Sequence, residues 1–395
     1  MAIVQLPKYC GHKSVIQALG EQDLLTSPPE KIAVHLPDAS FVYPSAIGFL
    51  AAWGIYQRKQ RGTQLVVTGD ENSRRYLSRM DLLAAIDSPF TEDFERRPPA
   101  GRFLPVTLIQ DDKSAKYAVD SVCDLVLHQF ENPRPFLPAL EWAVSEITDN
   151  ILIHSESETP GVVCAQYFDK DHRLGLAIVD CGRGLKASLE ESMKVWSHGD
   201  AISKAIQRGV TRDPEIGMGN GLAGTMEIAR VNGGDFQIWS GNVTLQVKAG
   251  IDKGFIEHGL VPGTGIYLSL DTRRPVNLAE TFIEGDANTS SYIIAQVEAG
   301  GIRVIDEVEH TGSRRPATHL RRKIQSLLAD SDAPLTLDFS GIHRASSSFL
   351  DELLGRLVKE MGVSQFQNRV KVINASSQLA AMANVVIQQR MEGIL

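Results

Sequence analysis

Short apolar segments alternate with longer amphipathic ones near the N-terminus, which is the pattern of strands followed by helices. Residues 32–36 and 65–67 are rich in Ile, Leu and Val, and we expect them to form strands. Residues 44–57 are predicted to form a helix with a proline in its first turn. Residues 73–86 carry apolar side chains at helical spacing and predict a second helix. This order of elements is typical of a small α/β unit.

The same order returns near the C-terminus. Strands are predicted at residues 335–339 and 370–373, and helices at residues 346–359 and 376–389. Few residues are identical between the two ends of the chain, so the repeat is one of pattern rather than of sequence.

The middle of the chain has a different rhythm. Two helices are expected there, at residues 140–155 and, after a glycine-rich stretch, at residues 221–231. Strands are also expected, at residues 162–168, 174–179, 235–239, 243–247 and 265–270. We therefore expect a mixed α/β (α+β) fold. In its central α/β sandwich, helices stack on one face of a largely antiparallel sheet.

The length of 395 residues corresponds to two or three domains. Two stretches have the composition of linkers, namely the Pro- and Arg-rich residues 96–101 and the polar residues 284–291. We therefore predict three domains, at residues 1–98, 99–275 and 276–395, with one smaller α/β domain on each side of the central one.

Charge and composition argue against several classes of protein. The net charge is −8, with 40 basic and 48 acidic residues, which disfavours a dedicated nucleic-acid binder. The longest apolar run, residues 46–56, is well short of the roughly 20 residues that a membrane-spanning helix needs. The four cysteines are far apart and form no Cys-x-x-Cys pair, so they predict reduced thiols rather than a zinc site or disulfides. We expect a cytoplasmic protein.

A first chemical motif lies on the helix predicted at residues 140–155. Glu146 and Asn150 are four residues apart, and side chains at this spacing share one face of a helix. The amide oxygen of Asn150 suits a hard cation such as magnesium. The Glu146 carboxylate can accept a proton from an attacking hydroxyl group or water. Taken alone, such a pair is more often a solvated helix face.

A second motif follows the strand predicted at residues 174–179. A buried carboxylate at Asp180 needs a hydrogen-bond donor, and the exocyclic amine of adenine is one such donor. Gly182 and Gly184 would let the backbone pass close to a flat ring. Thr264, at the start of a later strand, could complete a water network around the Asp180 carboxylate.

A third motif is the glycine-rich run that opens the helix predicted at residues 221–231. It contains Gly217, Gly219, Gly221 and Leu222. Backbone N–H groups and the helix dipole at such a position favour phosphate groups.

Two groups of basic residues stand out. Lys204 and Arg208 lie between the second and third motifs, in a segment that could form a lid whose cations reach the phosphates. The alternative is a surface helix without phosphate contact. A second group, from Arg314 to Lys323, is interpreted as a solvated helix face, with contact to an acidic partner or nucleic acid as the alternative.

In this order, the motifs of the central segment resemble the ATP-binding domain of the GHKL (Bergerat-fold) superfamily, and residues 143–154 most resemble its anti-sigma serine-kinase branch. The resemblance covers about residues 105–272. It implies ATP and Mg²⁺ as cofactors, with Glu146 as general base, Asn150 as magnesium ligand and Asp180 as the adenine reader. The other residues that it places at the ATP are Gly182, Gly184, Gly217, Gly219, Gly221, Leu222 and Thr264.

The two flanks resemble STAS domains, the fold of anti-sigma-factor antagonists. Residues 338–342 and the serines that follow them resemble the STAS loop whose serine is phosphorylated by a partner kinase. Ser348 falls on the phosphoacceptor position, with Ser347 beside it, and Ser346 stands where the family usually has Asp. With a constant offset of 303 residues, Ser45 aligns with Ser348 and is the N-terminal candidate.

Two functions are compatible with these resemblances. The first is an ATP-binding switch with serine protein kinase activity toward a STAS serine, either in the same chain or in a separate protein. The second is nucleotide-gated dimerisation or partner capture without protein kinase activity, as in the Hsp90-like branch. Both imply protein partners, of the STAS or anti-sigma type or a second copy of this chain in a homodimer. A histidine kinase is disfavoured because His128 lacks an acidic neighbour directly after it.

Overall fold

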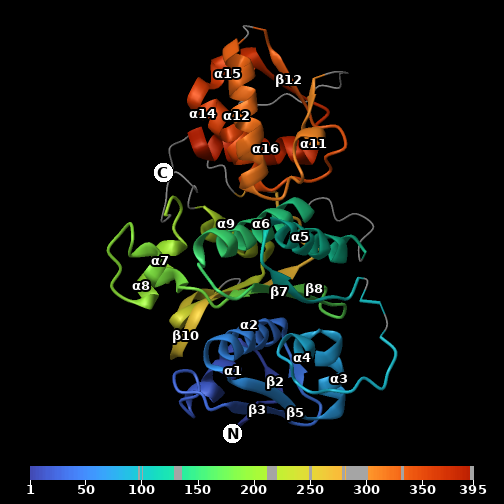
Figure 1. Ribbon diagram of the computed structural model, residues 1–395, viewed down its shortest axis with the longest axis vertical. Coiled ribbons are helices and arrows are strands. Elements are labelled where there is room, and N and C mark those ends of the chain that lie inside the picture. Colours follow the sequence, from blue (N-terminus) through green and yellow to red (C-terminus); the bar gives the residue numbers. More distant parts are fainter. Residues whose placement is uncertain are drawn as a thin grey trace.

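The computed structural model describes residues 1–96, 98–99, 101–128, 136–210, 220–248, 251–277, 281, 301–330 and 333–391. We refer to residues 1–96 as the N-terminal unit, to residues 101–277 as the central unit and to residues 301–391 as the C-terminal unit. Each unit contains one sheet of three or more strands. Figure 1 shows the units stacked along the longest axis, with the central unit between the other two. The α/β fold class expected from the sequence is confirmed.

The N-terminal unit is built on a parallel three-stranded sheet of order β1-β3-β5, with a two-stranded pair of β2 and β4 beside it. Its strands are β1 (Ala2–Gln5), β2 (Tyr9–Cys10), β3 (Lys31–Leu36), β4 (Phe41–Val42) and β5 (Gln64–Gly69). Its helices are α1 (His12–Gly20), α2 (Pro44–Arg61), α3 (Glu71–Arg79) and α4 (Leu82–Ala85). The single helix predicted at residues 73–86 is divided, because Asp81 adopts a left-handed conformation with φ 56°.

The C-terminal unit has the same strand order, as the repeated pattern predicts. Its three parallel strands are β11 (Ile302–Arg303), β12 (Leu335–Asp338) and β13 (Val370–Ile373). Its helices are α11 (Val304–Glu307), α12 (Arg314–Asp330), α13 (Ser347–Leu350), α14 (Arg356–Met361), α15 (Val363–Arg369) and α16 (Ser377–Met391). A π-helical turn, η1 (Asp351–Gly355), joins α13 to α14. Turns of this kind are frequent at functional sites.

The central unit contains a fully antiparallel sheet of order β6-β7-β8-β10-β9. Its strands are β6 (Phe103–Ile109), β7 (Gly161–Phe168), β8 (Arg173–Asp180), β9 (Asp235–Lys248) and β10 (Ile251–Asp271). Its helices are α5 (Asp112–Leu127), α6 (Leu137–His154), α7 (Gly184–Leu189), α8 (His198–Ala205) and α9 (Gly221–Asn232). The strands predicted at residues 235–239 and 243–247 form one strand, because the chain passes Gly241, with φ 66°, as an irregularity in the pairing with β10 rather than as a turn.

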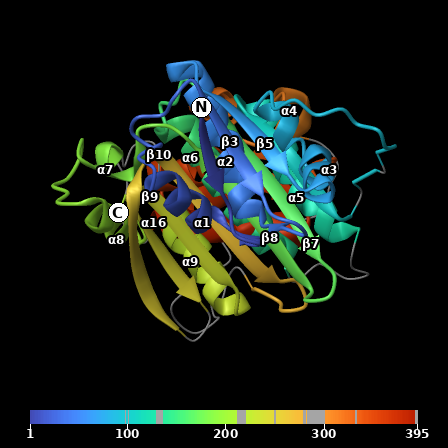
Figure 2. The same ribbon diagram turned by 90° about the horizontal axis from the view of Figure 1, so that it is seen from below.

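The two faces of the central sheet are covered by different parts of the chain. Helices α5, α6 and α9 lie on one face, and α2 of the N-terminal unit lies on the other (Figures 1 and 2). The approach of α2 is close, because a Cβ on Gly48 would lie 3.1 Å from the Ala177 side chain and 3.2 Å from that of Val179. The central sheet is therefore covered on both faces at β7 and β8.

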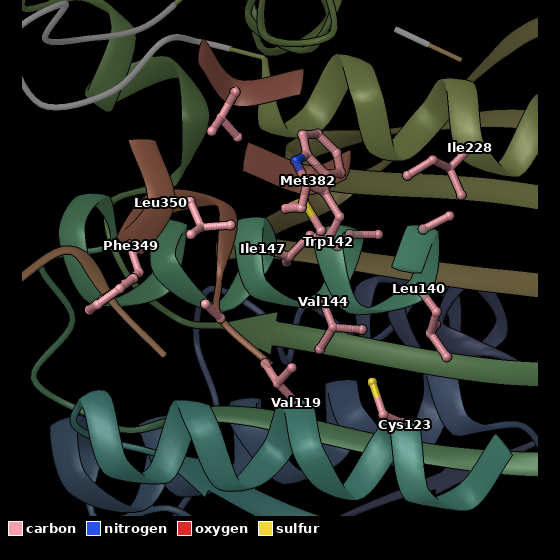
Figure 3. Packing of buried hydrophobic residues seen from close by; sticks show 14 of the residues in the cluster. Val119, Cys123, Leu140, Trp142, Val144, Ile147, Ile228, Phe349, Leu350 and Met382 are labelled. Atoms are coloured by element: carbon pink, nitrogen blue, oxygen red, sulfur yellow. The ribbon is translucent and has the colours of Figure 1, made fainter. Parts of the chain in front are cut away.

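The C-terminal unit packs on α6, on the side away from the sheet. Phe349 and Leu350 are fully buried there and belong to the same apolar cluster as Ile147 of α6. Figure 3 shows these side chains together with Met382 beside Trp142. The central and C-terminal units thus share one continuous core. None of the helices in the described part of the chain combines the length and the apolar character needed to cross a membrane.

Candidate functional site

The largest group of predicted site residues meets in one cavity of about 150 Å³ between α6, the end of β8, α7 and the start of α9. Predicted residues that line it are Glu146, Asn150, Asp180, Gly184, Gly221, Leu222, Thr264, Ser347 and Ser348. They come from both the central and the C-terminal unit, so the docking of the two units completes the cavity.

Sheet pairing brings Asp180 and Thr264 together. Thr264 of β10 is the direct antiparallel partner of Asp180 of β8 and, on its other side, of Ser240 of β9. The Asp180 carboxylate is 7% exposed and accepts a hydrogen bond from the Gly182 backbone N–H at 2.8 Å. Burial raises the pKa of this carboxyl group to about 6, although backbone hydrogen bonds act in the opposite direction. A ligand that donates a hydrogen bond would compensate this desolvation.

Three of the predicted glycines stand where a side chain would collide, and a Cβ on Gly184 would lie 2.9 Å from Oγ of Ser240. A Cβ on Gly182 would overlap the carbonyl oxygen of Ser155, and a Cβ on Gly221 would lie 2.7 Å from Oε2 of Glu146. Gly182 is not itself part of the cavity lining, so its role in the structure is to let the loop after Asp180 pass close to the end of α6. Gly221 lets the start of α9 approach Glu146.

Two serines of the C-terminal unit contact two carboxylates of α6. The Ser347 hydroxyl donates a hydrogen bond to Oε1 of Glu146, and the Ser348 hydroxyl donates to Oδ2 of Asp149. We call this pair of hydrogen bonds the serine contact. Ser346 caps α13 by accepting a hydrogen bond from the Phe349 N–H at 3.1 Å, which fixes the start of the helix that presents both serines.

Of the two carboxylates of the serine contact, Asp149 is buried and Glu146 is partly buried. Burial raises the pKa of Glu146, and the hydrogen bond from Ser347 acts in the opposite direction. Burial raises the pKa of Asp149 to about 7, with a smaller contribution of the same sign from the neighbouring Glu146. A carboxylate whose pKa is raised is a better proton acceptor than an ordinary one. Glu146 is therefore suited to accept the proton of the Ser347 hydroxyl.

Sequence reasoning assigned no role in the site to Asp149 or Arg314, which also line the cavity. The interpretation of residues 314–323 as a solvated helix face is wrong for Arg314 and Arg321. Arg314 forms ion pairs with Asp351 at 3.0 Å and with Glu352 at 3.1 Å. Arg321 forms an ion pair with Glu352 at 3.1 Å. The signal in the sequence was the acidic pair at 351–352 within an otherwise apolar helix, where buried charges require partners.

The two predicted lid cations do not line this cavity. Lys204, in the last turn of α8, is bonded to Asp200 at 3.0 Å and to the Lys194 carbonyl oxygen at 2.6 Å. Arg208 donates to the carbonyl oxygen of Thr281 at 3.3 Å. Their contact with phosphates stays a prediction. Gly217 and Gly219 lie outside the described residues.

Ser45, the N-terminal phosphoacceptor candidate, lies at the start of α2, on the other side of the central sheet from Glu146. It is 3% exposed, and its hydroxyl oxygen accepts a hydrogen bond from the His12 N–H at 3.3 Å. Ser45 and Ser348 thus occupy matching positions in the repeat but face opposite surfaces of the central unit. This placement does not favour phosphoryl transfer to Ser45 within the chain.

Comparison with known proteins identifies part of the C-terminal unit. Residues 317–380 match the family described as a STAS-like domain of unknown function (DUF4325), which supports the STAS resemblance of this flank. The match runs from α12 to the first turn of α16 and includes both serines of the serine contact. No curated protein matches the chain.

Proposed function

We propose that this chain is an ATP-binding regulatory switch of the GHKL type, whose central unit transfers a phosphoryl group to a serine of its own STAS-like unit. The observation that carries the proposal is the hydrogen bond from Ser347 to Glu146, within the cavity that also contains Asp180 and Thr264. The residue predicted as general base thus meets a hydroxyl group of the unit predicted to contain the acceptor. The contact favours Ser347 over Ser348.

The residues of the cavity are suited to Mg-ATP. Asp180 offers a buried acceptor for the adenine amine, and the N-terminus of α9 favours phosphate groups. Asn150 lies one helical turn from Glu146 and offers an amide oxygen for magnesium. Bound Mg-ATP would supply the phosphoryl group. Glu146 would take the hydroxyl proton from Ser347 as the serine oxygen bonds to phosphorus and ADP leaves.

A second candidate function is nucleotide-gated release of the C-terminal unit, without protein kinase activity. The cavity of about 150 Å³ is below the roughly 300 Å³ at the lower end of ordinary ligand sites. A whole nucleotide therefore requires the cavity to widen, and displacement of α13 from α6 would widen it. Such displacement would free the surface around Phe349 for a partner protein or for a second copy of the chain in a homodimer.

Intact-mass measurement of the full chain after incubation with Mg-ATP tests the kinase proposal. We expect one added phosphate in the wild-type chain and none in a Glu146→Gln variant that still binds ATP. Bound ATP with no phosphate on the chain or on any added STAS partner would refute kinase activity. Sizing with and without a non-hydrolysable ATP analogue then tests the second candidate, because an unchanged mass and shape in both states would exclude nucleotide-gated release.

A further inference from the structure

A second cavity, of about 380 Å³, lies between the N-terminal unit and the central unit. The end of α2 contributes Tyr56, Gln57 and Arg61 to its lining, and the central unit contributes Arg183, Lys186 and His198. Figure 1 shows β10 reaching from the central unit toward α1 and α2. The volume falls within the range of ordinary small-molecule sites, roughly 300–1,000 Å³.

The lining of this cavity is basic. It includes Arg61, Arg183 and Lys186 and contains no carboxylate from the described residues. The carboxylates that pair with Arg183 and Lys186 belong to Glu156, Glu190 and Glu191, which stand outside the lining.

Arg61 is the cation most available to a ligand. It is exposed, its guanidinium donates to the Thr26 carbonyl oxygen, and no carboxylate in the described part of the chain lies at ion-pair distance from it. Guanidinium and ammonium groups bind phosphate. Arg61 has no acidic competitor among the described residues, and the ion pair of Lys186 with Glu190 is a solvent-exposed i,i+4 pair, weak enough to exchange for a phosphate. The charge of the wall therefore points to an anionic ligand.

Gln57 gives a second and independent indication. Its side chain is 1% exposed and lines the cavity, and its Oε1 atom has no hydrogen-bond partner among the described residues. Buried polar atoms are rarely left without a partner, and a rotation of the Gln57 side chain would let this acceptor receive a hydrogen bond from a hydroxyl or amine group of a ligand in the cavity. Leu25, Leu260 and Val261 supply an apolar wall for the carbon skeleton of such a ligand.

We propose that this second cavity binds a small organic phosphate, with its phosphate at Arg61 and Lys186 and a hydroxyl group at Gln57. The site is distinct from the first cavity, which we call the nucleotide cavity because we propose that it binds ATP, but it adjoins that cavity, because Gly184 lines both. Gly263, also in the lining, packs directly on the Asp180 backbone, and its carbonyl oxygen accepts a hydrogen bond from Ser240 at 2.9 Å.

Calorimetric titration of the full chain with ribose 5-phosphate and with inorganic phosphate tests this assignment. We expect saturable binding of ribose 5-phosphate at millimolar concentration or below, and weaker binding of inorganic phosphate. Arg61→Gln and Lys186→Gln should each weaken ribose 5-phosphate binding by about tenfold or more. Arg58→Gln is the matched control, since Arg58 lies one turn earlier on α2, pairs with Asp87 and does not line the cavity.

The outcomes separate clearly. Absence of saturable binding of either compound, or equal binding by the wild-type, Arg61→Gln and Lys186→Gln chains, would overturn the proposal. Equal affinity for inorganic phosphate and ribose 5-phosphate would overturn the assignment of an organic ligand. A Gln57→Leu variant should bind inorganic phosphate as the wild type does but lose its preference for ribose 5-phosphate, a change that general misfolding would not produce. An Asp180→Asn variant, altered in the nucleotide cavity, should retain ribose 5-phosphate binding.

Discussion

Replacement of Asp149 by Asn tests directly whether the serine contact holds a buried carboxylate. Burial raises the pKa of Asp149 to about 7, against roughly 4 for an exposed Asp. The folded chain therefore binds this proton more tightly than the unfolded chain. The contribution of Asp149 to stability is fully present below the pKa of the unfolded state and is lost as the pH rises through 7. The Asp149→Asn variant lacks this titration, and its amide oxygen can still accept from Ser348.

The magnitude follows from the pKa difference. Between about pH 5 and about pH 7, titration of Asp149 lowers the free energy of unfolding of the wild-type chain by roughly 1.4 kcal/mol per pH unit, which amounts to about 3 kcal/mol. When the pH is raised from about 5 to about 8, the free energy of unfolding of the Asp149→Asn variant should therefore rise by about 3 kcal/mol relative to that of the wild type.

Urea denaturation followed by tryptophan fluorescence at the two pH values measures this difference. The control is Asp171→Asn, an exposed position in the turn between β7 and β8, whose difference from the wild type should be the same at both values. If the difference between the Asp149→Asn variant and the wild type does not change with pH, the reasoning about a buried carboxylate at the serine contact is wrong.

Three further predictions concern the cavity that we propose binds ATP and the docking of the units. Gly182→Ala should weaken binding of a fluorescent ATP analogue, because the added Cβ would overlap the Ser155 carbonyl oxygen. The control is Gly254→Ala, which has no atom within 4 Å of the added carbon and should bind the analogue as the wild type does. Equal binding by both variants would contradict the account. Asp180→Asn should lower ATP affinity by about tenfold or more in equilibrium dialysis, since the charged acceptor proposed for the adenine amine becomes a neutral amide oxygen, and unchanged affinity would place adenine elsewhere. Phe349→Ala should destabilise the chain by about 3–5 kcal/mol in urea denaturation. Phe255 is half-exposed, so Phe255→Ala should change the free energy of unfolding by no more than about 0.5 kcal/mol. Similar losses of stability in Phe349→Ala and Phe255→Ala would argue against the shared core.

Local pattern was sufficient to predict the long buried strands and helices, but it gave no element at α1, β1, β6 or α5. The strand at residues 335–339 and the helix at residues 140–155 appear close to where their apolar spacing places them. Long β9 was predicted as two strands, because Ser240 and Gly241 have the composition of a turn and only the pairing with β10 continues the strand through them. Propensity cannot reveal such pairing, since it depends on residues distant in the sequence.

In the candidate site too, local pattern predicted some features and long-range packing determined the others. The spacing of Glu146 and Asn150 placed both on one helix face, and sheet register then brought Asp180 to Thr264. The contact of Ser347 with Glu146 joins residues 201 positions apart and depends on how the C-terminal unit packs on α6. No local pattern encodes that packing, so the sequence could name both groups but could not predict that they meet.

Site-resolved mass spectrometry of the full chain after incubation with Mg-ATP tests the central claim most directly. Ser347 and Ser348 are adjacent, both are buried, and each is bonded to a different carboxylate, so each serves as the matched control for the other. The account predicts phosphate on Ser347 in the wild-type chain and in Ser348→Ala, and none in Ser347→Ala. Phosphate that persists at Ser348 in the Ser347→Ala chain, or its absence from both serines while ATP is bound, would contradict it.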